Sequence, residues 1–136
     1  MFTRDQFVPT QWNTSDEKVK FAHQFVSFVG SDFHFSKFPK WFYKRLSNTF
    51  GHIAHYNQLG FYETFFLSLE DKIRFLHQIA RWKCYGDPRF TYSDVERVLA
   101  SWVIDNEILG KYQTKLLEEQ EKRERDEYVR LKAKFE

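Results

Sequence analysis

Three helix-start signals follow one another along the chain, and each precedes apolar residues at helical spacing. They are Thr14 to Glu17, Ser68 to Asp71 and Ser93 to Glu96, each with a hydroxyl three residues before an acidic residue. The hydroxyl and the carboxylate can then each accept a hydrogen bond from a free backbone amide at the start of a helix. The spacing therefore predicts three helices and favours an all-α fold.

The helix expected after the first signal runs from about Asp16 to Val29. It carries two apolar series at helical spacing, one of small aliphatic residues (Val19, Ala22, Val26 and Val29) and one of rings (Phe21, Phe25 and Phe28). More than half of its circumference is apolar, which is typical of a helix surrounded by others. We expect it to be central in the fold and to end at the turn Gly30-Ser31-Asp32.

A second helix is expected to start at Pro39 and to run to about Tyr56, because proline suits the first turn of a helix. Its core face should consist of residues at helical spacing, namely Phe42, Leu46, Thr49, Ile53 and Tyr56. Gly51 lies inside this helix and indicates either close backbone packing or a break. Both interpretations stay open.

The two later signals each begin a helix with a clear apolar stripe. The stripe after Ser68 consists of Leu69, Ile73, Leu76, Ala80 and Cys84, and the turn Gly86-Asp87-Pro88 should end that helix. The stripe after Ser93 consists of Val95, Val98, Leu99, Trp102, Asn106 and Leu109. If Gly110 does not interrupt it, this last helix continues to Lys134 and is about 60 Å long at a rise of about 1.5 Å per residue.

Aromatic side chains make up 20% of the chain, and sixteen of them are Phe. One group lies in an expected loop (Phe33, His34, Phe35 and Phe38) and another in a short segment (Phe61, Tyr62, Phe65 and Phe66). A small domain has a limited interior, so we expect some of these rings at the surface, where aromatic residues favour protein binding. The alternative is a Phe-rich core that these loops close.

The chain changes character after Leu117. Residues 118–136 hold seven acidic and six basic residues and predict a solvated helix. We therefore divide the chain into an aromatic-rich helical core, 1–117, and a charged C-terminal extension, 118–136. Residues with a four-three alternation run along the extension, namely Leu117, Glu121, Glu124, Tyr128, Leu131 and Phe135. Two of these are Glu, so the series predicts only a weak coiled coil.

The candidate site lies on the second helix and its approach. It consists of basic, aromatic, amide and imidazole side chains: Lys37, Lys40, Trp41, Lys44, Arg45, Asn48, His52 and His55. Residues 33–62 contain four of the basic residues and no acidic one, giving a local charge of +4. These cations could contact phosphates while Trp41 or Tyr43 stacks on a base, which makes nucleic-acid binding the second interpretation. The simpler alternative is a solvated flank with Trp41 packed into the core.

Arg45 and His52 are separated by six residues on this helix. The pair resembles the Arg-x4-6-His motif of HEPN-type ribonucleases, all-helical proteins in which these two side chains act on the RNA backbone. The resemblance covers only these two positions, and Leu46 stands where that family tends to place a polar residue. It implies a helical ribonuclease as the third interpretation.

Other recognisable chemistry is absent from the sequence. There is no Gly-rich phosphate loop, Gly-x-Ser-x-Gly or His-Glu-x-x-His, and the His52 and His55 pair lacks a third and fourth ligand. The lone Cys84 excludes an intramolecular disulfide and a cysteine zinc site. We therefore expect no catalytic residues, no metal and no cofactor.

Net charge and hydropathy bear on the cellular location of the protein and on whether it binds membranes or nucleic acids. No apolar run reaches the roughly 18 residues that a spanning helix needs, and the N-terminus lacks a signal pattern, so we expect a cytoplasmic protein with no membrane contact. The net charge of +2 does not by itself indicate a nucleic-acid binder.

The sequence thus predicts an all-α fold, a compact bundle of four or five helices with a long charged C-terminal helix. The leading functional interpretation is a non-enzymatic protein that binds another macromolecule, most of all a protein partner or a second copy of itself. Exposed aromatic residues or the C-terminal helix would form the contact.

Overall fold

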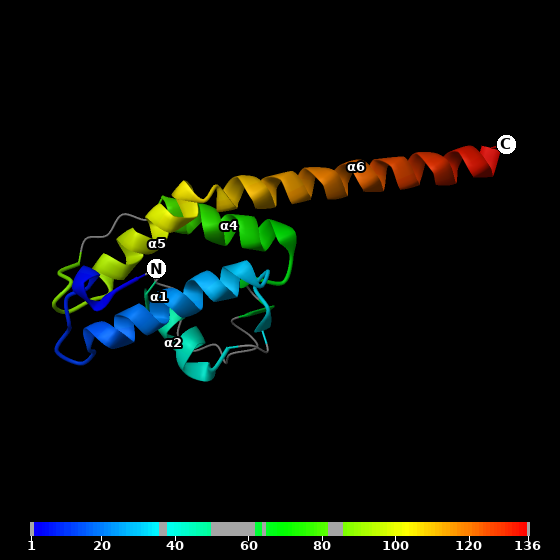
Figure 1. Ribbon diagram of the computed structural model, residues 1–136. Helices are drawn as coiled ribbons and strands as arrows, with labels where there is room; N and C mark the ends of the chain where they lie inside the picture. Colours follow the sequence, from blue (N-terminus) through cyan, green and yellow to red (C-terminus); the bar gives the residue numbers. More distant parts are fainter. Residues whose placement is uncertain (1, 36–37, 50–61, 64, 82–85, 136) are drawn as a thin grey trace.

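The computed structural model describes residues 2–35, 38–49, 62–63, 65–81 and 86–135. Over these ranges the chain is all-α, as predicted, and contains no strand. The elements in chain order are a 3-10 turn η1 (Arg4–Gln6) and the helices α1 (Ser15–Gly30), α2 (Lys40–Thr49), α4 (Leu69–Ala80), α5 (Ser93–Asp105) and α6 (Ile108–Phe135). The first four helices gather into a compact group, and α6 extends from it with its C-terminal end far from the other helices (Figure 1).

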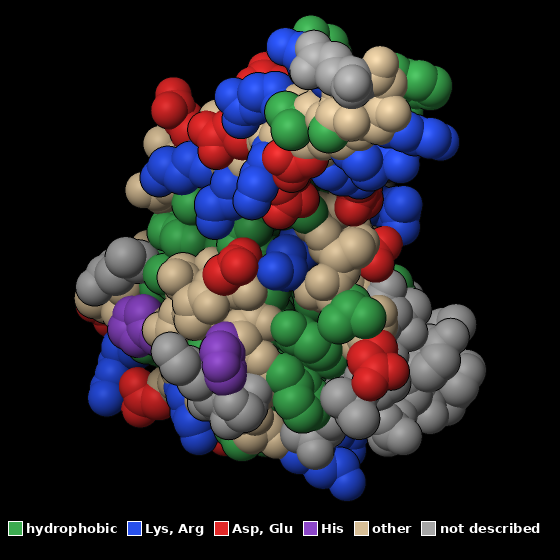
Figure 2. All heavy atoms as spheres, turned by 90° about the vertical axis from the view of Figure 1, so that its right-hand side faces the viewer, with side chains coloured by type: hydrophobic (Ala, Val, Ile, Leu, Met, Phe, Trp, Pro, Cys, Tyr) green, Lys and Arg blue, Asp and Glu red, His purple; other side chains and the backbone are tan. Residues whose placement is uncertain are grey.

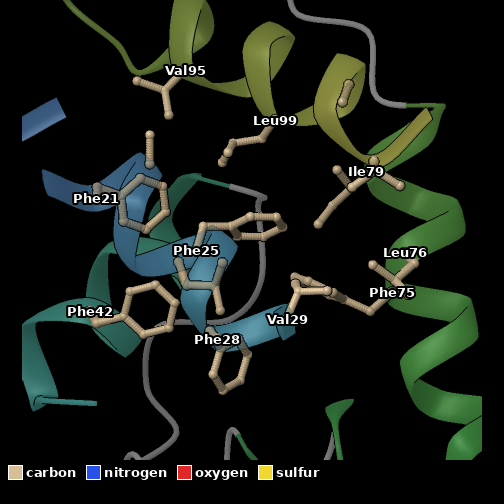
Figure 3. Close-up of a cluster of buried hydrophobic side chains, with 14 of the residues drawn as sticks. Phe21, Phe25, Phe28, Val29, Phe42, Phe75, Leu76, Ile79, Val95 and Leu99 are labelled. Atoms are coloured by element: carbon tan, nitrogen blue, oxygen red, sulfur yellow. The ribbon is translucent and has the colours of Figure 1, made fainter. Parts of the chain in front are cut away.

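Helix α1 begins where the first signal predicts. The hydroxyl of Thr14 accepts a hydrogen bond from the backbone amide of Glu17 at 3.1 Å. The Glu17 carboxylate accepts a hydrogen bond from the side chain of Asn13 at 2.6 Å. The three phenylalanines of α1, Phe21, Phe25 and Phe28, are fully buried, and they point among side chains of α2, α4 and α5 (Figure 3). The central position predicted for this helix is confirmed.

The end of α1 is a Schellman motif that is formed without a glycine in the left-handed position. Asp32 has φ 60° and Phe33 has φ 58°. The amide of Phe33 donates to the carbonyl of Phe28 at 2.8 Å, and the amide of Asp32 donates to the carbonyl of Val29 at 3.0 Å. The rings of Phe28 and Phe33 meet edge to face at 5.1 Å, which supplies the apolar contact that accompanies such a motif. The predicted turn is therefore confirmed, although Gly30 itself is the last helical residue.

Helices α2 and α4 begin where the sequence predicts them, but α4 ends at Ala80, with Arg81 as its C-cap, before the predicted turn at Gly86-Asp87-Pro88. The predicted continuation of α2 to Tyr56 lies outside the described residues. In α2 the predicted core residues Phe42, Leu46 and Thr49 are buried, while Gly51, Ile53 and Tyr56 lie outside the described residues. In α4 the hydroxyl of Ser68 accepts a hydrogen bond from the amide of Asp71 at 3.1 Å, as the signal predicts.

The buried face of α4 is rotated from the predicted stripe. Its fully packed residues are Phe75, Leu76 and Ile79, whereas Leu69, Ile73 and Ala80 are half-buried and Cys84 lies outside the described residues. The prediction followed the aliphatic residues at four-residue spacing and left out Phe75. The Phe75 ring contacts the Phe66 ring at a centroid distance of 4.7 Å. The face of α4 that carries Phe75 is therefore buried in the core.

The predicted capping box of α5 is wrong. The N-cap is Tyr92, with no side-chain hydrogen bond, and Ser93 is already helical and buried. The Asp94 carboxylate accepts hydrogen bonds from the amide of Val8 and the ammonium group of Lys18, each at 2.9 Å. Tertiary contacts to α1 and the N-terminal segment therefore decide how this helix begins.

The single long helix from Asp94 to Lys134 is also not formed. The chain does continue as a helix through Gly110, but it breaks before that residue, at Asn106 and Glu107. Glu107 has φ 53°, a left-handed conformation that ends α5 and lets α6 start in a new direction. The 28 residues of α6 span about 42 Å.

The two aromatic loops form part of the core. Phe33 and Phe66 are fully buried and stack at 5.3 Å, and the half-buried rings around them pack against the same cluster, namely Phe35, Phe38, Tyr62 and Phe65. The described Phe and Tyr rings of these two segments are buried or half-buried, whereas His34 is exposed. The large exposed rings among the described residues lie elsewhere, at Trp12, Phe90, Tyr128 and Phe135.

Candidate functional site

The residues of the candidate site that lie on α2, which we call the α2 strip, divide into an exposed edge and a packed edge. Lys40, Lys44 and Asn48 are exposed, whereas Trp41 and Arg45 are half-buried. Lys37, His52 and His55 lie outside the described residues.

Trp41 is held against α1. Its ring meets Phe21 edge on at a centroid distance of 6.4 Å, and the Lys20 ammonium group lies 5.0 Å from the ring centroid. A tryptophan with these neighbours stabilises the contact between α1 and α2. It is the packed position that the sequence analysis gave as the alternative to base stacking.

Arg45 is held against the beginning of α5. Its guanidinium carbon lies 4.2 Å from the centroid of Tyr92, and Nη2 donates to Oδ1 of Asn13 at 3.4 Å. Burial raises the pKa of the Tyr92 hydroxyl, and the Arg45 charge offsets part of that rise. The Arg45 guanidinium group therefore contacts the Tyr92 ring and the Asn13 side-chain amide of its own chain. The geometry of the Arg45 and His52 pair lies outside the described residues.

A buried ion pair lies close to this contact. Lys18 is fully buried, and its ammonium group donates to Asp94 at 2.9 Å and to the carbonyl of Pro88 at 2.9 Å. The same group lies 5.5 Å from the Tyr92 ring centroid. No local pattern in the sequence indicates that Lys18 and Asp94 meet, so this cluster could not be predicted from it.

Helix α6 presents the second candidate surface, and its first turns anchor it to the bundle. Tyr112 is buried, and its hydroxyl donates to Oδ1 of Asp32 at 2.8 Å. Lys72 of α4 donates to the same oxygen at 3.3 Å. Burial raises the pKa of the Asp32 carboxyl, but the Tyr112 hydrogen bond and the charges of Lys72 and Lys115 together hold that pKa below its usual range. Burial and the Asp32 charge raise the pKa of Tyr112.

Beyond this anchor α6 is held by its own side chains. All residues from 118 to 135 are exposed. Acidic residues stand four positions before basic ones at four places, namely Glu118 and Lys122, Glu119 and Arg123, Glu121 and Arg125, and Asp126 and Arg130. Each such pair stabilises a helix by about 0.2–0.5 kcal/mol, and this order of charges is the favourable one. Pairs at this spacing favour the helical conformation where α6 leaves the core, and the structure shows Glu127 and Arg130 as a further ion pair on this stretch.

Four large apolar side chains lie on one face of this exposed rod, and we call them the α6 seam. They are Leu117, Tyr128, Leu131 and Phe135, and their exposed fractions are 56%, 65%, 40% and 78%. They share a face because the intervals between them fit the helical repeat of about 3.6 residues. Charged side chains crowd around this end of the molecule, with hydrophobic ones among them (Figure 2).

Comparison of the chain with protein-family models, with curated proteins and with solved structures finds no match in any of the three. In the described ranges, no three or more His, Cys, Asp or Glu side chains gather to hold a metal ion. None of the helices in the described part of the chain combines the length and the apolar character that crossing a bilayer requires.

Proposed function

We propose that the protein acts by binding another protein through the α6 seam. One observation carries the proposal: the large apolar side chains of the seam are exposed on one face of α6. Aligned apolar residues on one helix face are the usual contact when helices bind each other or a groove. Large exposed rings such as Tyr128 and Phe135 are enriched at protein interfaces.

The alternative of nucleic-acid binding has less support. Lys40 and Lys44 are exposed cations that could contact phosphates. Trp41 and Arg45, which the alternative needs for stacking and charge, are engaged with Phe21 and Tyr92.

A face-specific cross-linking experiment tests the proposal. A photoreactive benzophenone amino acid replaces Leu131 in one variant and Ala133 in a control, since Ala133 lies in the same turns on the opposite side of α6. In cell extract we expect the Leu131 variant to form a covalent adduct with a protein and the Ala133 variant to form much less. Equal yields from the two positions, or no adduct from Leu131, would contradict binding through the seam.

A further inference from the structure

We propose that the protein bound at the α6 seam is a second copy of this chain, with the two α6 helices antiparallel. This inference rests on the proposed function and names its partner. Three features of the exposed rod support it: its charge distribution, the position of Glu121 and Glu124 on the same helix face as the seam, and its attachment to the core at one end.

The charges of the rod are divided by sign along its length. Residues 118–127 hold six acidic and three basic residues, a net charge of −3. Residues 128–136 hold three basic residues and one acidic residue, Glu136, a net charge of +2. Two parallel rods would place like segments together, whereas two antiparallel rods place −3 against +2 twice. Complementary potentials of this kind select the orientation of an interface.

The helix dipole does not explain this division. It favours acidic residues in the first turn of a helix and basic residues in the last, and its effect falls off within those turns. Lys132 and Lys134 lie in the last turn of α6 and fit it. The acidic segment begins at Glu118, well after the first turn at Ile108. The dipole therefore does not account for the acidic composition of residues 118–127.

The antiparallel arrangement also suits Glu121 and Glu124, two charged residues on the same face of α6 as the seam. When Leu117 of one copy lies opposite Phe135 of the other, residue 126 is at the centre of the pair. Glu124 then lies opposite Tyr128, whose hydroxyl can donate to the carboxylate, and Glu121 lies opposite Leu131 within the basic segment. Both glutamates thus face the part of the other rod that has the opposite charge.

The attachment of α6 favours the same orientation. Each rod is anchored to its own bundle near Tyr112 and points away from it (Figure 1). Antiparallel rods place the two bundles at opposite ends of the pair, while parallel rods would crowd them together. The overlap of residues 117–135 spans about 27 Å, which is short for a helix pair. We therefore expect association in the micromolar range.

Sedimentation velocity on the purified full chain, from ~1 to ~100 μM, is the first test. We expect the mass to rise from monomer towards dimer. Lys132→Glu/Lys134→Glu gives the basic segment a negative charge and should weaken association at least about tenfold. Adding Glu121→Lys/Glu124→Lys reverses the opposing segment and should restore association. Lys40→Glu/Lys44→Glu changes the net charge by the same amount on α2 and should have no effect.

A distance measurement tests the orientation on the unaltered rod. One spin label is placed at the exposed Gln113 in a Cys84→Ser background, and pulsed electron resonance measures the separation between copies. The antiparallel pair predicts about 40 Å, from 26 residues at about 1.5 Å each. A parallel pair predicts about 10 Å.

The outcomes separate this inference from the proposed function. A chain that stays monomeric at ~100 μM while circular dichroism shows intact helix overturns the second-copy inference, as does a separation near 10 Å. If such a monomer still forms a Leu131 adduct with a different protein in extract, binding through the seam stands. If Leu131 cross-links to nothing, including itself, both proposals fail.

Discussion

At the scale of single residues, the contact between α1 and α5 depends on one buried charge. Lys18 has no solvent exposure, and its ammonium group is neutralised by Asp94. Removing one member of a buried pair leaves the other charge without compensation and costs about 3–5 kcal/mol.

Asp94→Asn removes the charge and keeps an oxygen that can accept from the Val8 amide. We expect the free energy of unfolding in urea to fall by about 3 kcal/mol. Asp16→Asn is the control, because the Arg4 and Asp16 pair is exposed and should change stability by less than about 1 kcal/mol. Adding Lys18→Met to Asp94→Asn should recover part of the loss, and equal effects of Asp94→Asn and Asp16→Asn would contradict this account.

Replacing Gly86 and Gly110 with alanine should change the stability of the protein in opposite directions. A Cβ at Gly86 would lie 2.7 Å from Oγ1 of Thr91, which is held by its own hydrogen bond to the Asp87 carbonyl at 2.9 Å. Gly86→Ala should therefore destabilise the protein by about 1–3 kcal/mol. Gly110→Ala meets nothing within 4 Å inside a helix and should stabilise it by up to about 1 kcal/mol. Thermal melts of the two variants measure both changes in stability. A shift of the melting temperature in the same direction for both variants would contradict these predictions.

Sequence predicts some of these residue roles well and others not at all. Thr14 and Ser68 cap their helices because capping depends on residues within one turn. The same pattern at Ser93 does not form a cap, and its neighbour Asp94 pairs with Lys18, which is 76 positions away in the chain. The charge of Arg45 predicts a binding residue, and nothing near it in sequence indicates the Tyr92 ring that it packs on.

At the scale of elements, the break between α5 and α6 sets the direction of the exposed rod. It is made by Glu107, a non-glycine residue at φ 53°. A left-handed conformation costs an ordinary residue about 1–2 kcal/mol, while glycine adopts it readily. The sequence offered Gly110 as the visible candidate for a break, yet that residue is helical. Local composition could not locate the break because no residue type that favours one stands at position 107.

Glu107→Gly should stabilise the protein by about 0.5–1 kcal/mol, since the relief of strain exceeds the entropy that glycine adds to the unfolded chain. Urea denaturation with Glu107→Ala as the control measures the difference. The alanine variant should gain nothing, because its Cβ meets the same steric limit. A gain for alanine equal to that for glycine would show that strain at this position is not the cause.

At the scale of the whole molecule, Asp32 joins three helices. It follows α1 and accepts hydrogen bonds from Tyr112 of α6 and Lys72 of α4. Its pKa is lowered in the folded state, so its contribution to stability is present above the ordinary Asp pKa of about 3.9 and is lost as the pH falls below that value.

Asp32→Asn should therefore be less stable than the wild type at neutral pH and should lose less stability on acidification. The difference in unfolding free energy between the two should shrink as the pH falls from about 5 to 2.5. Urea denaturation across this range provides the values. A difference that stays constant with pH would exclude a charged Asp32 as the source.

If the chain divides after residue 117, the core should keep its stability without the C-terminal extension. Since residues 118–135 are all exposed, a chain ending at Leu117 should keep the thermal midpoint of the full protein to within about 3 °C, equivalent to roughly 1 kcal/mol. It should lose any association that depends on the α6 seam. Differential scanning calorimetry at a concentration where the full chain is monomeric makes the comparison. A large drop in the midpoint would mean that the extension stabilises the bundle.

The all-α fold and most helix positions could be predicted because caps and apolar periodicity are local properties. The face that α4 buries, the fate of the aromatic loops and the α2 strip could not, because each depends on which distant rings meet. Phe33 illustrates this: its sequence neighbours indicate a loop, yet it is buried between Phe66 and Phe75.

The anchor at Tyr112 also makes α6 a lever arm. From Tyr112 to Phe135 the helix spans about 35 Å, so a tilt of about 10° at the anchor moves the tip by about 6 Å. Small rearrangements among Asp32, Tyr112 and Lys72 would thus be amplified at Phe135, where the reach of the molecule is greatest. Anything held at that tip is mechanically coupled to the end of the central helix.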